Sequence, residues 1–325
     1  MKTKAEIVEN WLPRYTQHPL SDFGEYILLT NFNNYVDIFC EQLRLPQPGY
    51  GANMRMATAE NITIINFGMG SPNAAIIMDL LSAIGPKACL FLGKCGGISS
   101  KTKLGDLILP LAGIRGEGTS NDYYPPEVPA LPAFMLQRAV STAIRDAHRD
   151  YWTGTVYTTN RRIWEHDEKF KEYLKDTRAM AVDMETATLF TCGFANHIPT
   201  GALLLVSDNP MMPEGVKTAE SDREVTHNFA PEHVTIGIEA LKLIIGERKT
   251  VKHLKYDWYS KREKQMAVKK EGVTYDEIVR SVRAGNFAPV YYLMGEEAYY
   301  IDKVSEFIVD TVLKEEEKDF NLTVC

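Results

Sequence analysis

The sequence contains no long apolar run, and this absence excludes a membrane-spanning helix. Such a helix needs about 20 consecutive, mostly apolar residues, and no run in the 325 residues is that long. The opening residues, Met1–Glu6, lack the apolar core of a secretion signal. Positive charge is not in excess either: the formal net charge is −7, whereas proteins that coat nucleic acid are basic. We therefore expect neither a membrane partner nor a nucleic-acid partner.

Cysteine and histidine are also scarce, with five and seven residues respectively. No cysteine pair has metal-ligand spacing beside a histidine, so we predict no metal site and no cofactor. Scattered cysteines of this kind are typical of buried free thiols in a cytoplasmic protein. The five cysteines are Cys40, Cys89, Cys95, Cys192 and Cys325.

Charge is densest toward the C-terminal end. The stretch Glu247–Gly272 carries nine Lys and Arg against four Asp and Glu, with few large apolar side chains. Such a composition is typical of a linker or a solvated helix. We therefore predict a main domain over residues 1–250, a basic linker over 251–272 and a small fragment over 273–325.

Short apolar runs alternate with helical patterns over the first 245 residues. This alternation predicts an α/β fold with a largely buried sheet. Ligands of such sheets bind beyond the carboxyl ends of the strands, so the residues after each strand are the candidates for function. The predicted strands are 26–30, 62–67, 88–92, 106–109, 154–157, 180–183 and 202–206, and the predicted helices are 73–84, 133–148, 185–196 and 231–245.

The first candidate loop is glycine-rich and opens a helix. Gly68 and Gly70 let the backbone approach a ligand closely, and Ser71 suits the helix cap before Asn73. The free N–H groups of a helix start attract anions such as phosphate. A tight turn without a ligand explains the same residues. A dinucleotide-binding fold is disfavoured, because it requires an acidic residue after the next strand.

Three further loops follow later strands. The stretch Gly93–Gly97 holds one cation, Lys94, which could contact a phosphate or merely lie on a surface turn. Asp183-Met184-Glu185 enters a helix, where a carboxylate can simply complement the helix dipole. Ser207-Asp208 follows a strongly apolar strand, where an aspartate can be a turn residue.

Together these loops resemble the nucleoside phosphorylase and nucleosidase superfamily of the phosphorylase-I type. The matching residues are Gly68–Gly70, Met184–Glu185 and Ser207–Asp208, in the order and spacing of that family. The resemblance implies a three-layer sandwich around a mixed, largely buried sheet. It also implies that the glycine loop binds near the sugar or phosphate, the Met-Glu pair holds the ribose, and the Ser-Asp pair contacts the purine.

Within the superfamily, the chain is most similar to the AMP nucleosidase family, over about residues 5–255. The resemblance implies hydrolysis of AMP to adenine and ribose 5-phosphate, so the 1–250 segment would be the nucleosidase catalytic domain. The similar stretches are Phe67–Ala75, Phe91–Ile98, Arg115–Tyr124, Thr158–Asp167 and Thr218–Thr226.

The resemblance assigns catalytic roles to two carboxyl groups. Asp208 would donate a proton to the departing adenine, with Arg223 at the position of an arginine that contacts this aspartate in related enzymes. Glu185 would accept hydrogen bonds from the ribose hydroxyls and stabilise the developing positive charge, and Met184 would pack against the ribose. Related hydrolases carry an acidic residue after the first strand, where this chain has Asn31–Asn34. The residue that activates water therefore stays open, with Glu185 as one candidate.

The 5′-phosphate of AMP requires cations or N–H donors. Besides the helix start, the candidate phosphate ligands are Lys94, Arg115, Arg161 and Arg162. Trp164 either flanks adenine or closes the core, and Thr119 lies in a loop that lines the pocket of family members.

The family also implies a homo-oligomer, with a hexamer as one arrangement. A purine nucleoside phosphorylase is the alternative function, which is disfavoured because such enzymes have an arginine near the second glycine loop.

The C-terminal segment resembles a different family. Val290–Asp302 and Asp319–Val324 are similar to the start of the delta subunit of the bacterial DNA polymerase III clamp loader. We expect a truncated β-α fragment, joined by fusion of two neighbouring genes with Met266 as the original start of the second. The alternatives are a small tail that packs on the enzyme and a module that binds replication proteins.

Overall fold

A computed structural model describes residues 2–246, 275–287 and 298–312. The chain divides into two compact units, Met1–Val251 and Lys252–Cys325. The predicted linker over 251–272 lies outside the described residues, and the predicted domain bounds stay predictions. Among the described helices, none is long and apolar enough to cross a membrane.

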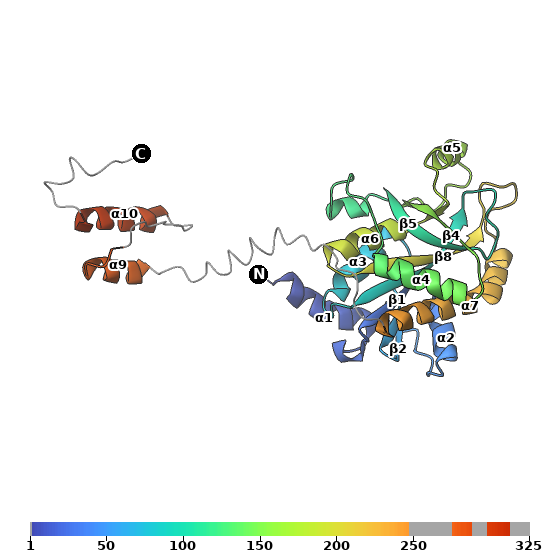
Figure 1. The fold of residues 1–325 in the computed structure, drawn as a ribbon, viewed down its shortest axis with the longest axis horizontal. Helices are drawn as coiled ribbons and strands as arrows, with labels where there is room; N and C mark the ends of the chain where they lie inside the picture. The colour runs from blue at the N-terminus through green and yellow to red at the C-terminus, as the bar shows by residue number, and fades with distance from the viewer. Residues whose placement is uncertain (1, 247–274, 288–297, 313–325) are drawn as a thin grey trace. The chain divides into compact units, whose positions relative to one another are not determined.

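The first unit holds one eight-stranded sheet, with helices before, between and after its strands (Figure 1). The strands are β1 (Tyr26–Thr30), β2 (Met56–Ala59), β3 (Ile62–Asn66), β4 (Ala88–Gly97), β5 (Leu107–Gly116), β6 (Tyr151–Thr159), β7 (Ala181–Asp183) and β8 (Thr200–Asp208). The helices are α1 (Lys4–Thr16), α2 (Asn33–Gln42), α3 (Ser71–Leu81), α4 (Phe134–Asp146), α5 (Glu168–Asp176), α6 (Thr186–Ala195) and α7 (Ala219–Gly246), with the short 3₁₀ helices η1 (Leu20–Asp22) and η2 (Thr119–Asp122).

The sheet is mixed, and part of it closes on itself. Its strand order is β2-β3-β1-β4-β7-β6-β5-β8, and β8 pairs with β4 as well as β5. Strands β3, β1, β4 and β8 run parallel to their neighbours in that series, whereas β7 pairs antiparallel to β4. The parallel strands therefore bring their carboxyl ends to one edge of the sheet.

Both faces of the sheet are buried, because successive residues of a strand point to opposite sides. In β1, Ile27 and Leu29 pack in a core with residues of α1, α3 and α6. Tyr26 and Leu28 pack in a second core with residues of α2, α4 and α7. Full burial of each such leucine stabilises the fold by about 1.5–3 kcal/mol. The predicted three-layer α/β sandwich is confirmed.

One predicted loop is a strand. The glycine-rich stretch 93–97 continues β4 to Gly97, paired with β8 and β7. Its glycines serve close packing: a Cβ on Gly93 would lie 2.4 Å from the Phe91 ring, and one on Gly97 would lie 2.2 Å from Thr102 Oγ1. These glycines predicted a loop, because glycine more often marks a turn or loop than a crowded position inside a sheet.

The last helix of the first unit is longer than predicted. The pattern indicated a start near Pro231, yet α7 begins at Ala219 and contains Pro231. Because proline removes one backbone donor, it usually ends a helix pattern. The additional turns carry polar residues, among them Asp222 and Thr226, that contribute to the site described below.

The second unit is described over two helices, α9 (Tyr275–Arg283) and α10 (Ala298–Val312). Val282 and Val304 are its buried apolar residues within the described part. Of the predicted strand, turn and helix over 290–302, only the beginning of α10 falls within the described residues. The β-α fragment and its resemblance to a clamp-loader subunit stay predictions.

Candidate active site

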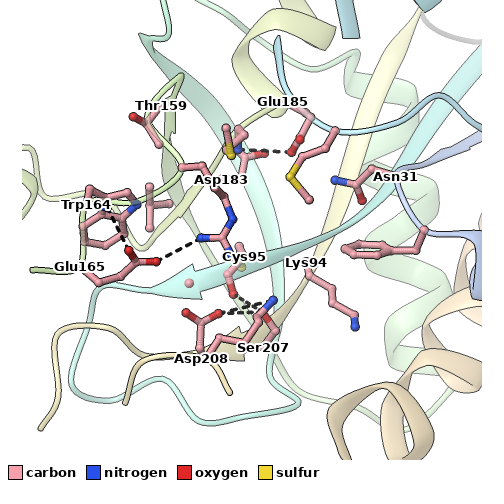
Figure 2. Close-up of a pocket in the computed structure, with 17 residues that line it drawn as sticks. Asn31, Lys94, Cys95, Thr159, Trp164, Glu165, Asp183, Glu185, Ser207 and Asp208 are labelled. Carbon is pink, nitrogen blue, oxygen red and sulfur yellow. Dashed lines mark hydrogen bonds and ion pairs between the residues drawn. The ribbon is translucent and has the colours of Figure 1, made fainter. Parts of the chain in front are cut away.

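A pocket opens where the carboxyl ends of several strands meet. Its lining comes from the ends of β1, β4, β6, β7 and β8, and from the segment before α7. Figure 2 shows Glu185 and Asp208 on opposite sides of this pocket. The two carboxyl groups that the sequence analysis predicted as catalytic are therefore brought to one cavity from separate strands.

Glu185 is a buried carboxyl group, only 2% exposed, at the entrance to α6. The Gly70 N–H donates to its Oε1 at 2.7 Å, and the Met184 N–H donates to Oε2 at 3.3 Å. Burial raises the pKa of Glu185 to about 8, and the charge of Asp183 adds to the rise. A carboxyl group with such a pKa can hold or accept a proton near neutral pH.

Asp183 fixes the turn on which Glu185 stands. Its Oδ1 accepts the Thr158 hydroxyl at 2.7 Å, and its Oδ2 accepts the Thr186 N–H at 2.8 Å. The second contact satisfies a free donor at the start of α6. Burial raises the pKa of Asp183 while these donors oppose the rise. Asp183 thereby joins β6, β7 and α6 at the wall of the pocket.

The glycine loop contacts the Met184–Glu185 pair. Gly68 and Gly70 have φ values of 87° and 93°, a conformation that residues with a Cβ rarely adopt. This turn aims the Gly70 N–H at Glu185 and brings the Ser71 hydroxyl to the Met184 carbonyl at 2.6 Å. The loop therefore positions the pair that the sequence analysis assigned to the ribose.

The rest of that loop is held by its own contacts. Asn73 donates through Nδ2 to the Met69 carbonyl at 2.8 Å. Met69 lines the pocket, whereas Gly68, Gly70, Ser71 and Asn73 do not. Direct binding of sugar or phosphate by these four residues stays a prediction.

Asp208 is the last residue of β8, on the side of the pocket opposite Glu185. The Ser207 hydroxyl donates to its Oδ1 at 2.8 Å, and Lys217 Nζ lies 3.9 Å from the same oxygen. Burial raises the pKa of Asp208, with Lys217 as the strongest opposing influence. Burial thus favours the protonated carboxyl, which is the form that can donate a proton.

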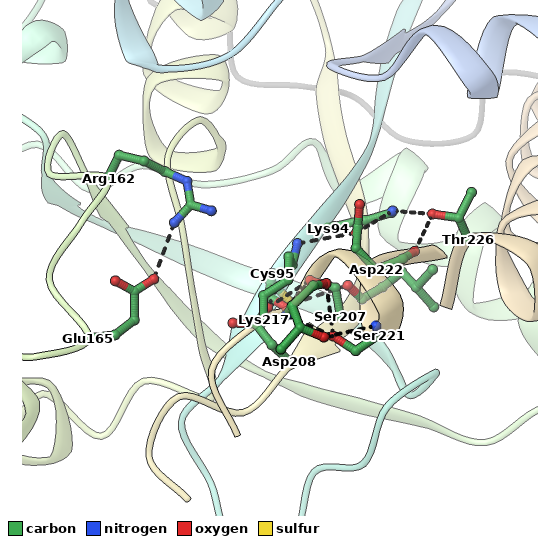
Figure 3. Close-up of polar contacts among 12 residues, drawn as sticks. Lys94, Cys95, Arg162, Glu165, Ser207, Asp208, Lys217, Ser221, Asp222 and Thr226 are labelled. Atoms are coloured by element: carbon green, nitrogen blue, oxygen red, sulfur yellow. Dashed lines mark hydrogen bonds and ion pairs between the residues drawn. The ribbon is translucent and has the colours of Figure 1, made fainter. Parts of the chain in front are cut away.

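Lys94 lines the pocket, but its ammonium group is paired with α7 (Figure 3). Its Nζ donates to Asp222 Oδ1 at 2.9 Å and to Thr226 Oγ1 at 2.6 Å. Asp222 Oδ1 also lies 3.5 Å from Lys217 Nζ, so this carboxylate links both lysines. These contacts join β4 to α7 through Lys94. They also balance the charge of its ammonium group with the Asp222 carboxylate.

Of the predicted arginines, Arg162 alone lines the pocket. Its guanidinium donates to Glu165 at 3.2 Å, and the pair is visible in Figure 3. Trp164 also lines the pocket, but it is 5% exposed and packs edge-on against Phe170. The indole thus faces the cavity on one side and packs on the other in a small third core, which includes Tyr157 and Leu174.

Besides Gly68, Gly70, Ser71 and Asn73, four more predicted site residues lie outside the pocket lining. Arg115 donates to its own loop, at Ser120 Oγ, Asn121 Oδ1 and three backbone carbonyls. Thr119 lies in η2 within that loop. Arg161 pairs with Asp167 at 2.6 Å. Arg223 is exposed on α7, and the cation that the structure brings to Asp208 is Lys217.

Several residues of the pocket were not among the predicted site residues. Asn31 and Phe32 line it directly after β1, in the segment where related hydrolases carry an acidic residue, but neither was assigned a role. Cys95 was not predicted to line the pocket, because residues 93–97 were interpreted as a loop. No sequence pattern around Lys217 predicts a site residue, since only the path of the chain between β8 and α7 brings it close to Asp208. Glu165 and Thr159 line the pocket as well.

The described residues include no group of three or more His, Cys, Asp or Glu side chains arranged to hold a metal ion. The described cysteines, Cys40, Cys89, Cys95 and Cys192, are buried free thiols. The carboxyl groups that line the described pocket are those of Glu165, Asp183, Glu185 and Asp208, and the cations that line it are Lys94, Arg162 and Lys217.

The fold and these loops define a known class of protein. Residues 25–245 match the family described as the phosphorylase superfamily, and the chain belongs to it. The predicted family is confirmed. Within the superfamily, the chain is 61% identical to an AMP nucleosidase from Bacteroides thetaiotaomicron, whose crystal structure it matches with a TM-score of 0.68 over 76% of this chain and 100% of that chain.

Two other similar proteins are more distant. The chain is 30% identical to the AMP nucleosidase of Escherichia coli K12 over 282 residues, which cover 73% of this chain and 58% of that protein. It therefore spans less than two thirds of the length of that curated relative. A uridine phosphorylase from Vibrio fischeri shares the fold, with 20% identity and a TM-score of 0.60 over 69% of this chain and 93% of that one.

Proposed function

We propose that this chain hydrolyses the N-glycosidic bond of AMP to give adenine and ribose 5-phosphate. The observation that carries the proposal is the pair of buried carboxyl groups, Glu185 and Asp208, on opposite sides of one pocket, each with a raised pKa. The similarity to AMP nucleosidases supports AMP as the substrate.

Asp208 is the proposed general acid. Adenine leaves poorly as an anion, so a proton must reach its N7 as the bond between N9 and C1′ breaks. Burial holds Asp208 toward its protonated form, and the Ser207 hydroxyl restricts its orientation. Lys217 limits the rise of the pKa of Asp208, so the proton stays available for transfer.

Glu185 is proposed to act on the sugar. Loss of adenine leaves positive charge on C1′ and the ring oxygen, which the ionised form of Glu185 stabilises. Because the pKa of Glu185 is raised to about 8, this form is the minority near neutral pH and grows as pH rises. Two backbone N–H groups, from Gly70 and Met184, hold the carboxyl group in place. A carboxylate has further lone pairs, which are free to accept the ribose hydroxyls.

Arg162 is the proposed ligand of the 5′-phosphate. It lines the pocket, and its partner Glu165 can be exchanged for a phosphate, with which arginine forms paired hydrogen bonds. Arg115 and Arg161 lie outside the pocket lining, and Lys94 is held by two partners, Asp222 and Thr226. The structure therefore favours Arg162 among the predicted cations.

The test compares two incubations. One contains the protein with AMP, and the other contains adenosine with inorganic phosphate. Ribose 5-phosphate formed from AMP supports the hydrolase, whereas ribose 1-phosphate formed in the second incubation would support the alternative, a nucleoside phosphorylase. Water is favoured as the nucleophile because Lys94, the predicted cation at the end of β4, is already paired with Asp222.

Two further properties belong to the same proposal. We propose a homo-oligomer, as the family resemblance implies, and a cytoplasmic enzyme, because its substrate is a nucleotide and the described cysteines are unpaired. Light scattering of the purified protein tests the first, and cell fractionation tests the second.

A further inference from the structure

Asn31 carries a hydrogen-bond acceptor that the fold leaves unused. It directly follows β1 and lines the pocket. Its Oδ1 is buried and has no hydrogen-bond partner among the described residues. Buried polar atoms of folded proteins are nearly always paired, and an exception commonly marks a place where water or a ligand binds.

The same side chain also interacts with Glu185. Hydrogen bonding from Asn31 lowers the pKa of that carboxyl group, against the larger effect of burial. In Figure 2, the amide nitrogen of Asn31 points toward the side of the pocket where Glu185 lies. A molecule bound beside this contact can reach the unused amide oxygen of Asn31 and a lone pair of the Glu185 carboxylate, which are two acceptors. Water, with two O–H donors, fits this pair.

We propose that Asn31 positions the water molecule that attacks C1′ of the ribose. The inference rests on the proposed hydrolysis of AMP. Asp208, which serves the departing adenine, lies across the pocket from Asn31 and Glu185. Water held on the Asn31 side thus approaches C1′ from the face opposite the leaving base.

The proton balance of the step is complete without another reactant. The electron pair of the N9–C1′ bond passes to adenine, and Asp208 gives its proton to N7. The water oxygen forms the new bond to C1′, and its proton passes to the Glu185 carboxylate. Asn31 accepts a hydrogen bond and exchanges no proton, because an amide oxygen is a poor base. Exchange with solvent then restores Asp208 and Glu185.

The test uses two substitutions of Asn31 in the full chain. Asn31→Leu preserves the approximate size but removes the acceptor, whereas Asn31→Asp keeps an acceptor. Asn33→Leu is the matched control, because Asn33 lies on the same turn but pairs with Asn66 Nδ2 and does not line the pocket. Each protein is assayed with AMP for kcat and KM, and its product is analysed in aqueous methanol.

We expect Asn31→Leu to lower kcat about 10–100-fold, the range for loss of one positioning contact, with little change in KM. Methanol competes with water for C1′, so the ratio of methyl ribose 5-phosphate to ribose 5-phosphate should rise when water loses its position. Asn31→Asp should retain more turnover than Asn31→Leu. The acid limb of the pH–kcat profile of Asn31→Asp should also move to higher pH, because the added negative charge raises the pKa of Glu185.

Three results would overturn the inference. One is a higher KM with unchanged kcat and an unchanged methanol ratio, which would assign Asn31 to a ribose hydroxyl. The second is the same change of ratio in Asn33→Leu, and the third is unaltered kinetics in both Asn31 variants. The proposed function is tested separately by the unmodified protein: if that protein releases no ribose 5-phosphate from AMP, the hydrolase proposal itself fails.

Discussion

Replacing Glu185 by glutamine should stabilise the protein, and the gain should grow with pH. In the folded chain, burial keeps the Glu185 carboxyl group protonated up to about pH 8, whereas its ordinary pKa is 4.5. Between these values the unfolded chain has lost the proton and the folded chain has kept it. Stability therefore falls as pH rises, because folding must take up a proton. Glutamine resembles the protonated acid and has no such dependence.

The size of the effect follows from the interval between the two pKa values. Each unit corresponds to about 1.4 kcal/mol, so the interval from 4.5 to about 8 amounts to about 5 kcal/mol. This figure is an upper bound, because part of the rise depends on the charge of Asp183. Glutamine can still accept the Gly70 N–H through its Oε1, so the glycine loop should keep its contact.

The assay is urea unfolding, followed by tryptophan fluorescence, from pH 5 to pH 8.5. The difference in free energy of unfolding between Glu185→Gln and the unmodified protein should increase by up to about 1.4 kcal/mol per pH unit and level off near pH 8. Glu6→Gln serves as a control of opposite sign. Hydrogen bonds from Thr3 lower the pKa of exposed Glu6, so this variant should lose stability above about pH 4.5 and regain parity as pH falls. A Glu185→Gln difference that is constant or shrinks with pH would refute the reasoning.

Three other substitutions test the roles assigned in the pocket. Asp208→Asn has no proton to give, so turnover should fall by about 10²–10⁴-fold while calorimetry still detects AMP binding; full turnover would show that another group is the acid. Lys217→Met removes the cation beside Asp208, so the pKa of Asp208 should rise further, and the alkaline limb of the pH–kcat profile should move to higher pH; a shift to lower pH would contradict this contact. Arg162→Ala, measured in the Asp208→Asn background, should weaken AMP binding by about 10–100-fold and adenosine binding much less. Arg161→Ala is its control, because Arg161 pairs with Asp167 outside the pocket lining, and an equal loss in both variants would remove Arg162 from the phosphate site.

Local pattern was sufficient for much of the fold. The strand Tyr26–Thr30 was predicted with its observed bounds, because a short run of apolar residues between turn signals has one stable place, inside a covered sheet. Elements with mixed patterns, such as α1 and α5, were missed. The extent of β4 was missed as well, because glycines that accommodate neighbouring side chains look the same in sequence as glycines of a loop.

In the candidate site too, some residues were predictable from the sequence and others were not. Position after a strand drew attention to the loops that hold Glu185 and Asp208, because such positions face the ligand edge of an α/β sheet. The family resemblance then assigned the two residues catalytic roles, which stay predictions. The partners of those residues were not predictable in this way. Gly70 and Glu185 are far apart in the chain, as are Lys94 and Asp222, and each pair meets only after the sheet and its helices have packed.

The sequence by itself determined the family and the class of fold, and it made Glu185 and Asp208 candidates, because strand patterns and local motifs depend on neighbouring residues. Only the tertiary structure decided which cations face the pocket, that Lys217 lies beside Asp208, and that Asn31 holds an unused acceptor. The physical reason is that the charge state and the free hydrogen-bonding capacity of a side chain depend on burial and on partners from distant segments.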